Sequence, residues 1–117
     1  MRLHSKIWVS AYIRQVAQAG AFAVVVRSGE ATAGAIYIKI ALLDGTARLY
    51  SPALILSENF AMERAWQLEF GDAPLEEREV DAFLKSQISF DADLWVIEVE
   101  DREGRHFLAD QVEDVDL

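Results

Sequence analysis

The chain has 117 residues, of which 52% are hydrophobic and 26% are charged, and these proportions are typical of one globular domain. They exclude a disordered tail, a collagen-like repeat and a multidomain assembly. Acidic residues outnumber basic ones by 20 to 11, which gives a formal net charge of −9. This charge disfavours nucleic acid or an anionic membrane surface as a partner, because phosphate contacts need basic side chains.

The charge is unevenly distributed along the chain. Residues 1–57 hold six basic and two acidic side chains, a net of +4, whereas residues 91–117 hold two basic and ten acidic ones, a net of −8. Either two parts of one fold attract each other, or a basic face meets a partner.

The chain contains no cysteine, which excludes disulfides, cysteine-based zinc sites and a cysteine nucleophile. The apolar stretch 7–13 is interrupted by Ser10 and Tyr12, so we do not expect a signal peptide. No run approaches the ~20 apolar residues of a membrane span.

The first elements predicted are one helix and one strand. Residues 5–19 favour a helix with Ser5 as its N-cap and Gly20 just beyond its end. Apolar side chains cover most of this helix, so it lies deep in its own fold or offers a second face to another subunit. Trp8 is the candidate for such a subunit contact. The valine-rich run 22–27 predicts a central strand.

A β-hairpin is predicted around Asp44-Gly45, a pair typical of a two-residue type I′ turn. This turn places Ile40 opposite Leu49. The outer face of the hairpin then collects basic and aromatic side chains, namely Tyr37, Lys39, Arg48 and Tyr50. Such a face binds single-stranded nucleic acid by stacking and phosphate contacts, unless a helix covers it.

Further along, Ser51-Pro52 is expected to end a strand, and residues 52–62 to be irregular or briefly extended. Residues 64–70 alternate again, with three inward side chains, which are Trp66, Leu68 and Phe70. Residues 75–88 predict a second helix with an acid-rich start. Its apolar stripe consists of Val80, Phe83, Leu84 and Ile88.

The segment 91–106 is the most acidic part of the chain and predicts a hairpin. A strand over 94–101 is followed by a turn, so that Glu100 faces His106. A neighbouring carboxylate would raise the pKa of His106 and suit it to general acid–base work. Glu98 and Glu100 share a strand face roughly 7 Å apart, where they either flank a ligand or are simply exposed to solvent. The segment lacks the glycine and the final glutamate of an EF-hand.

These elements follow the order α-β-β-β-β-α-β-β. They predict an α+β fold in which two helices pack on a mainly antiparallel sheet of five or six strands. Residues 1–109 form the single domain, and residues 110–117 form an acidic C-terminal tail.

Several stretches together resemble a bacterial family of small single-domain proteins known only as a domain of unknown function. They are IWVSA at 7–11, AGAI at 33–36, DGTARLY at 44–50 and FDADLWVIEVEDREGRHF at 90–107. The resemblance runs from about residue 2 to residue 108, and its most specific part is the last stretch. It implies a bacterial, cytoplasmic protein, but it assigns no activity and no functional residue.

Three functions are consistent with the sequence. We expect first a non-enzymatic protein-interaction module that binds a protein partner or itself, because the chain has no nucleophile motif, no cysteine, two histidines and no phosphate loop. We nominate no cofactor and no metal ligand. The second hypothesis is a ligand-binding or metal-binding domain, or a small enzyme, that uses Glu98, Glu100 and His106. The third, disfavoured by the net charge, is a weak binder of single-stranded nucleic acid through strands 36–50.

Overall fold

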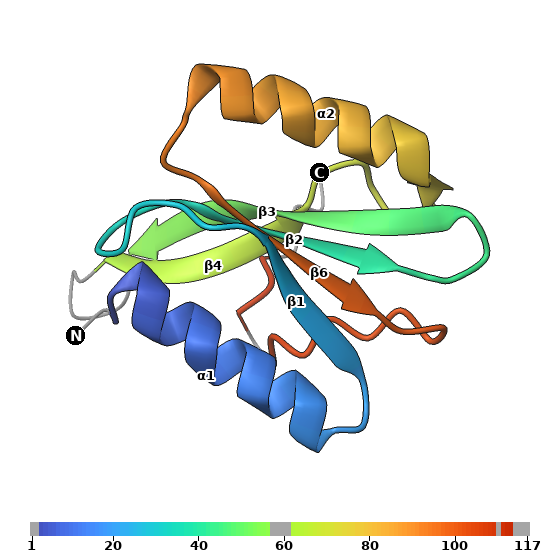
Figure 1. The fold of residues 1–117 in the computed structure, drawn as a ribbon, viewed down its shortest axis with the longest axis horizontal. Helices are drawn as coiled ribbons and strands as arrows, with labels where there is room; N and C mark the ends of the chain where they lie inside the picture. The colour runs from blue at the N-terminus through green and yellow to red at the C-terminus, as the bar shows by residue number, and fades with distance from the viewer. Residues whose placement is uncertain (1–2, 57–61, 110, 114–117) are drawn as a thin grey trace.

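The computed structural model describes residues 3–56, 62–109 and 111–113, and it contains one sheet between two helices (Figure 1). Helix α1 covers one face of the sheet and α2 covers the other. The elements are α1 (Ser5–Gln18), β1 (Phe22–Arg27), β2 (Ile36–Ala41), β3 (Thr46–Leu56), β4 (Met62–Leu68), β5 (Leu75–Glu76), α2 (Glu77–Phe90) and β6 (Trp95–Glu100). The predicted α+β class, the two helices and the six-stranded, mostly antiparallel sheet are confirmed.

Helix α1 begins one residue earlier than its predicted cap implies. His4 occupies the N-cap position, and Ser5 lies inside the first turn, fully buried. The Ser5 hydroxyl donates a hydrogen bond to the Gly34 carbonyl at 2.7 Å, so it anchors the helix to a loop instead of capping it. The predicted end is confirmed, since Gly20 follows the helix with φ +86° and its N–H bonds to the Ala17 carbonyl.

The strand order is β1-β6-β2-β3-β4, with β5 paired to the N-terminal end of β3 at Thr46 and Ala47. Strand β6 lies parallel to β2 and antiparallel to β1, so it separates two strands that follow each other in sequence. The prediction that 22–27 is a central strand is therefore wrong, because β1 stands at the edge of the sheet.

The hairpin between β2 and β3 differs from the predicted register by one residue. Ile40 stands opposite Arg48, not Leu49. The loop contains three residues, because Leu42 N–H bonds to the Thr46 carbonyl and Leu43 adopts φ +64°. The Asp44 carboxylate accepts hydrogen bonds from the Thr46 N–H and hydroxyl. This side-chain contact holds the longer turn in place.

Strand β3 does not end at Pro52 but continues to Leu56 beside β4. Pro52 is opposite Trp66, whose own N–H and C=O bond to Gln111 and Glu113 on the other side of β4. Pro52 and Trp66 thus form a pair without mutual backbone hydrogen bonds, so the missing N–H of Pro52 leaves no gap in the ladder between β3 and β4. Of the stretch predicted to be irregular, residues 57–61 lie outside the described residues, as do residues 110 and 114–117 of the tail.

Two further predictions are wrong. Phe70 lies beyond the end of β4 and packs edge-on against Phe83 of α2, with ring centroids 5.1 Å apart, instead of joining Trp66 on the inner face. Residues 101–109 form turns and irregular chain instead of a last strand, because β6 already has a partner on each edge.

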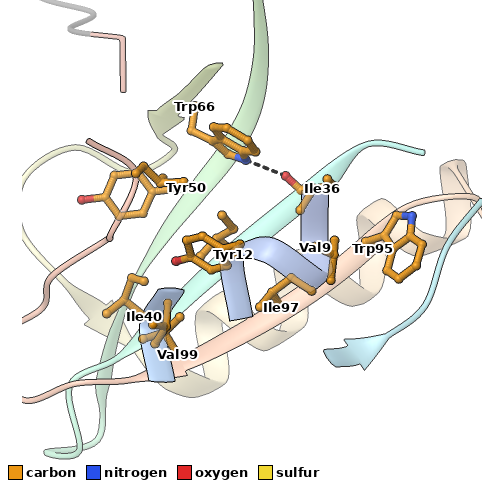
Figure 2. Close-up of a cluster of buried hydrophobic side chains, with 12 residues drawn as sticks. Val9, Tyr12, Ile36, Ile40, Tyr50, Trp66, Trp95, Ile97 and Val99 are labelled. Atoms are coloured by element: carbon orange, nitrogen blue, oxygen red, sulfur yellow. Dashed lines mark hydrogen bonds between the residues drawn. The ribbon is translucent and has the colours of Figure 1, made fainter. Parts of the chain in front are cut away.

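The core has two parts, one on each face of the sheet. On the α1 face, the alternating isoleucines of β2 and the inward residues of β6 pack against α1 (Figure 2). The Trp66 indole N–H donates to the Ile36 carbonyl at 2.8 Å inside this part. On the α2 face, a smaller set contains Ala47, Leu49, Val80, Leu84, Leu94 and Val96. Neither described helix has the length and apolar character needed to cross a membrane.

Candidate functional site

The acidic segment does not form the predicted acid–base pair. Glu98 and Glu100 alternate with the α1-facing residues of β6, so they point to the α2 face. His106 lies on the α1 face, edge-on to Tyr50 at 5.3 Å, and its Nδ1 accepts a hydrogen bond from Leu108 N–H. Burial lowers the pKa of His106, opposite to the predicted direction. The cause of the failure is the absent last strand, since no register brings Glu100 and His106 together.

No metal-binding arrangement is visible in the described part of the chain: no three His, Asp or Glu side chains there are placed to hold an ion. Glu98 instead contacts the Lys39 ammonium at 3.2 Å.

The predicted basic and aromatic face is divided between the two sides of the sheet. Tyr37 and Lys39 face α2, whereas Arg48 and Tyr50 face α1, because the hairpin register is shifted by one residue. Tyr37 donates its hydroxyl to the Gln87 side chain at 3.3 Å. The prediction that these side chains share one outer face is therefore wrong.

Lys39 is the most enclosed cation among the described residues, with a side chain only 5% exposed. Its ammonium contacts three carboxylates from two elements, which are Glu77 at 3.1 Å, Asp81 at 2.8 Å and Glu98 at 3.2 Å. Burial alone would lower the pKa of Lys39, but hydrogen bonds to Asp81 and Glu77 and the charge of Glu98 outweigh it, so the pKa lies above its usual value. Lys39 therefore joins α2 to the sheet and is not available to a phosphate.

Trp8 lies half-buried on α1 with its ring against other aromatic rings. It stacks on Tyr12 with centroids 5.0 Å apart and meets Trp66 at 4.6 Å. Its contacts within the described chain are thus with the core on the α1 face.

The feature that sequence reasoning missed is the outward face of β1. Three alternate side chains of this edge strand are exposed and apolar: Phe22 by 56%, Val24 by 41% and Val26 by 59%. Helix α2 packs over β3 and β5 and leaves this face open (Figure 1). The continuous apolar run 22–26 resembles a strand buried on both faces, so no local signal in the sequence distinguished the edge position.

A groove of about 310 Å³ lies between β1 and α2 on this face. Its lining consists of Val26, Arg27, Lys39, Asp81, Leu84, Lys85, Ile88, Val96 and Glu98. The apolar floor continues the exposed face of β1, and the charged rim is close to neutral because bases and acids are mixed. Such a surface suits an extended apolar segment better than a small charged ligand.

The two edge strands of the sheet, β4 and β1, differ in whether another segment pairs with their outer backbone groups. Beside β4, the segment 111–113 pairs with Trp66, through Trp66 N–H to Gln111 C=O at 2.7 Å and Glu113 N–H to Trp66 C=O at 2.6 Å. Beside β1, the described residues provide no such cover. An uncovered, apolar edge strand invites pairing with another strand.

A second hollow of about 350 Å³ lies toward the β4 edge of the sheet, on the opposite side from β1. It is lined by Ala33, Ala35, Pro52, Ala53, Arg64, Ala65 and Trp66. Arg64 is directed to the start of α1, where it donates to the Ser5 hydroxyl at 2.7 Å and the Leu3 carbonyl at 3.2 Å. These bonds fix α1 to β4.

Comparison with known proteins places the chain in a family. The family model described as a protein of unknown function (DUF1491) matches residues 3–109, and no curated protein matches the chain. A crystal structure of a DUF1491 family protein from Caulobacter crescentus is similar with 42% identity, a TM-score of 0.78 and coverage of 97% of this chain and 100% of that one. The NMR structure of a DUF1491 family protein from the same organism gives 42% identity, a TM-score of 0.77 and coverage of 97% and 99%.

The solution structure of protein Atu0922 from A. tumefaciens is similar as well. It shares 40% identity with a TM-score of 0.72, and the match covers 86% of each chain. The agreement of sequence and fold over most of each chain confirms the resemblance drawn from the motifs at 7–11, 33–36, 44–50 and 90–107. The chain therefore belongs to the DUF1491 family of proteins of unknown function.

Proposed function

We propose that this protein is a non-enzymatic protein-interaction module, and that it binds an extended segment of polypeptide along the open edge of β1. The observation that carries the proposal is the run of three exposed apolar side chains on an edge strand, Phe22, Val24 and Val26. A strand added there would satisfy the outer backbone groups of β1 and bury these side chains at once.

Natural proteins usually protect such an edge with lysine, proline or a covering segment. Strand β1 has neither lysine nor proline within Phe22–Arg27, and its one protective device is the bulge between Val25 and Arg27. An edge that is left apolar over four regularly paired residues is therefore better explained by a partner than by solvent exposure.

The other two hypotheses receive less support. The ligand or enzyme hypothesis needed Glu98, Glu100 and His106 in one place, and they lie on two faces of the sheet. The nucleic-acid hypothesis needed Lys39 at the surface, where it would meet phosphate, but its side chain is buried against carboxylates. We extend the proposal to a bacterial cytoplasm, because the similar structures come from bacteria and the chain has no cysteine that requires an oxidising compartment.

Site-specific photo-crosslinking in cells that naturally express the protein tests this function. A photoreactive residue replaces Val24 on β1 or, as a control, Ile7 on α1, which is exposed to a comparable degree at 55%. We expect one discrete protein adduct from position 24 that position 7 does not form. No adduct at position 24, or the same adducts from both positions, would overturn the proposal.

A further inference from the structure

Opposite charges without an ionic partner in the described chain lie near the two ends of β1: Arg27 on β1 itself and Glu100 on the neighbouring strand β6. At the C-terminal end of β1, Arg27 donates to the Ala92 carbonyl at 2.9 Å, and its buried Nε has no hydrogen-bond partner among the described residues. No carboxylate lies within ion-pair distance of Arg27 in that part of the chain. At the N-terminal end, Phe22 stands opposite Glu100 of β6, and the half-exposed Glu100 carboxylate also makes no ion pair there.

Opposite charges near the two ends of a strand favour antiparallel pairing of two identical strands about a two-fold axis. When two identical strands pair in antiparallel fashion, the C-terminal end of each lies beside the N-terminal end of the other. The Arg27 end of one β1 then lies at the same end of the joined sheet as Glu100 of the other copy. Glu100 belongs to β6, one strand behind β1, so the two residues are about 10 Å apart across the sheet and attract each other at long range. A parallel arrangement would bring each charge beside its own copy, which is repulsive.

The side chains of β1 are also complementary to themselves in one register. With Val24 on the two-fold axis, Val24 faces its own copy, and Phe22 lies beside Val26 of the other chain, the residue at the bulge between Val25 and Arg27. On the α1 side, Ala23 faces Val25. Every cross-strand pair between residues 22 and 26 is then apolar on both faces, which is the pairing that stabilises an antiparallel ladder.

The net charge of −9 does not oppose this contact. Strand β1 itself carries no acidic side chain, and its one charged residue is Arg27. The groove beside β1 mixes Arg27 and Lys85 with Asp81 and Glu98. Charges farther away than about 8 Å are largely screened at physiological ionic strength.

We propose that the strand bound by β1 is β1 of a second copy of this chain, paired in antiparallel fashion with Val24 on the two-fold axis. The inference rests on the proposed function and names its partner. The two sheets join into one, in the order β4-β3-β2-β6-β1 and then the same strands of the second copy in reverse. Because one pair of short strands buries less than the roughly 800 Å² per partner of a standard interface, we expect a concentration-dependent dimer.

A single introduced cysteine tests both the partner and the register, since the natural chain has none. In Val24→Cys the two cysteines are directly opposite, with Cα atoms about 4.5–5.5 Å apart, within the range of a disulfide. In the control Val26→Cys, which is more exposed, the two cysteines lie about 13 Å apart along the strands. We expect Val24→Cys to form a covalent dimer at least tenfold faster under mild oxidation, read on a non-reducing gel.

Charge reversal gives an independent measurement by sedimentation equilibrium. Glu100→Arg removes no side-chain hydrogen bond or ion pair of the described chain and should weaken the dimer about threefold, because a long-range attraction to Arg27 of the other copy becomes a repulsion. Arg27→Glu should do the same, and the double variant should regain most of the affinity, since a coupled pair is not additive. Circular dichroism confirms that each variant is folded, which matters most for Arg27→Glu.

The outcomes separate this inference from the proposed function. A chain that stays monomeric up to about 1 mM, or a dimer in which Val24→Cys crosslinks no faster than Val26→Cys, overturns the second-copy inference. If the photoreactive residue at position 24 then captures a different protein, the interaction function still stands. If it captures nothing, both fail.

Discussion

The substitution Lys39→Met tests whether the buried ammonium holds α2 on the sheet. It keeps the length of the side chain but removes the charge, so Glu77, Asp81 and Glu98 are left gathered around an uncharged group. Removing one partner of a fully buried ion pair costs about 3–5 kcal/mol, because an uncompensated charge remains. These carboxylates are 38%, 58% and 26% exposed, so water stabilises them in part. We therefore expect a loss of about 2–3 kcal/mol in the free energy of unfolding.

Urea denaturation at pH 7, followed by circular dichroism, measures this loss. The matched control is Lys85→Met, an exposed lysine on α2 that makes no ion pair among the described residues, and it should change stability by less than about 0.5 kcal/mol. A cost below about 1 kcal/mol for Lys39→Met would refute the reasoning, because it would mean that α2 is held by its apolar stripe alone.

The same variant has a definite pH dependence. The pKa of Lys39 is raised in the folded protein, so its contribution is complete below the unfolded lysine pKa of about 10.4 and is lost as the pH rises toward the folded value. The natural protein should therefore lose stability more steeply than Lys39→Met above about pH 10.4. Comparing the two proteins cancels the tyrosines, which titrate in the same range.

Two further changes probe other parts of the fold. A Cβ at Gly29 would collide with the backbone of Asp93, so Gly29→Ala should lower the free energy of unfolding, measured by urea denaturation, by at least about 2 kcal/mol. The control Gly20→Ala, where only φ +86° opposes the change, should cost about 1 kcal/mol. Equal losses for the two variants would contradict the clash. Because burial lowers the pKa of His106, the stability that it contributes is present above about pH 6.5 and is lost as the pH falls toward the folded value. His106→Asn, whose amide oxygen can accept the Leu108 N–H, should lose less stability than the natural protein between pH 7.5 and pH 5, and identical slopes would count against the assignment.

The elements that local pattern determines were predicted from the sequence. The alternating isoleucines of β2 and the stripe of α2 that begins at Val80 are both buried where the pattern indicated. In each case the periodicity of the chain matches the geometry of the element, so the buried face follows without knowledge of the neighbours.

The predictions that failed depend on contacts outside the local pattern. The observed hairpin register differs from the predicted one because Asp44 accepts a hydrogen bond from Thr46 and Leu43 adopts a positive φ. Leucine rarely adopts a positive φ, so the sequence does not indicate this turn. Lys39 was predicted on an outer face that either binds nucleic acid or is covered by a helix, and it is buried because carboxylates from α2 and β6 meet it. The charge of a residue does not reveal which other elements will be placed against it.

The edge position of β1 follows from the same limitation and bears most directly on function. A run of apolar residues is equally suited to the centre of a sheet and to an edge that a partner covers, because both positions bury the outward face. Only the insertion of β6, some seventy residues later, separates β1 from β2 and leaves β1 with one neighbour. The apolar side chains of Phe22, Val24 and Val26 are thus those of a central strand, while the described chain supplies a partner on one side alone. A second β1 on the open side would give this strand the two neighbours that its sequence suits.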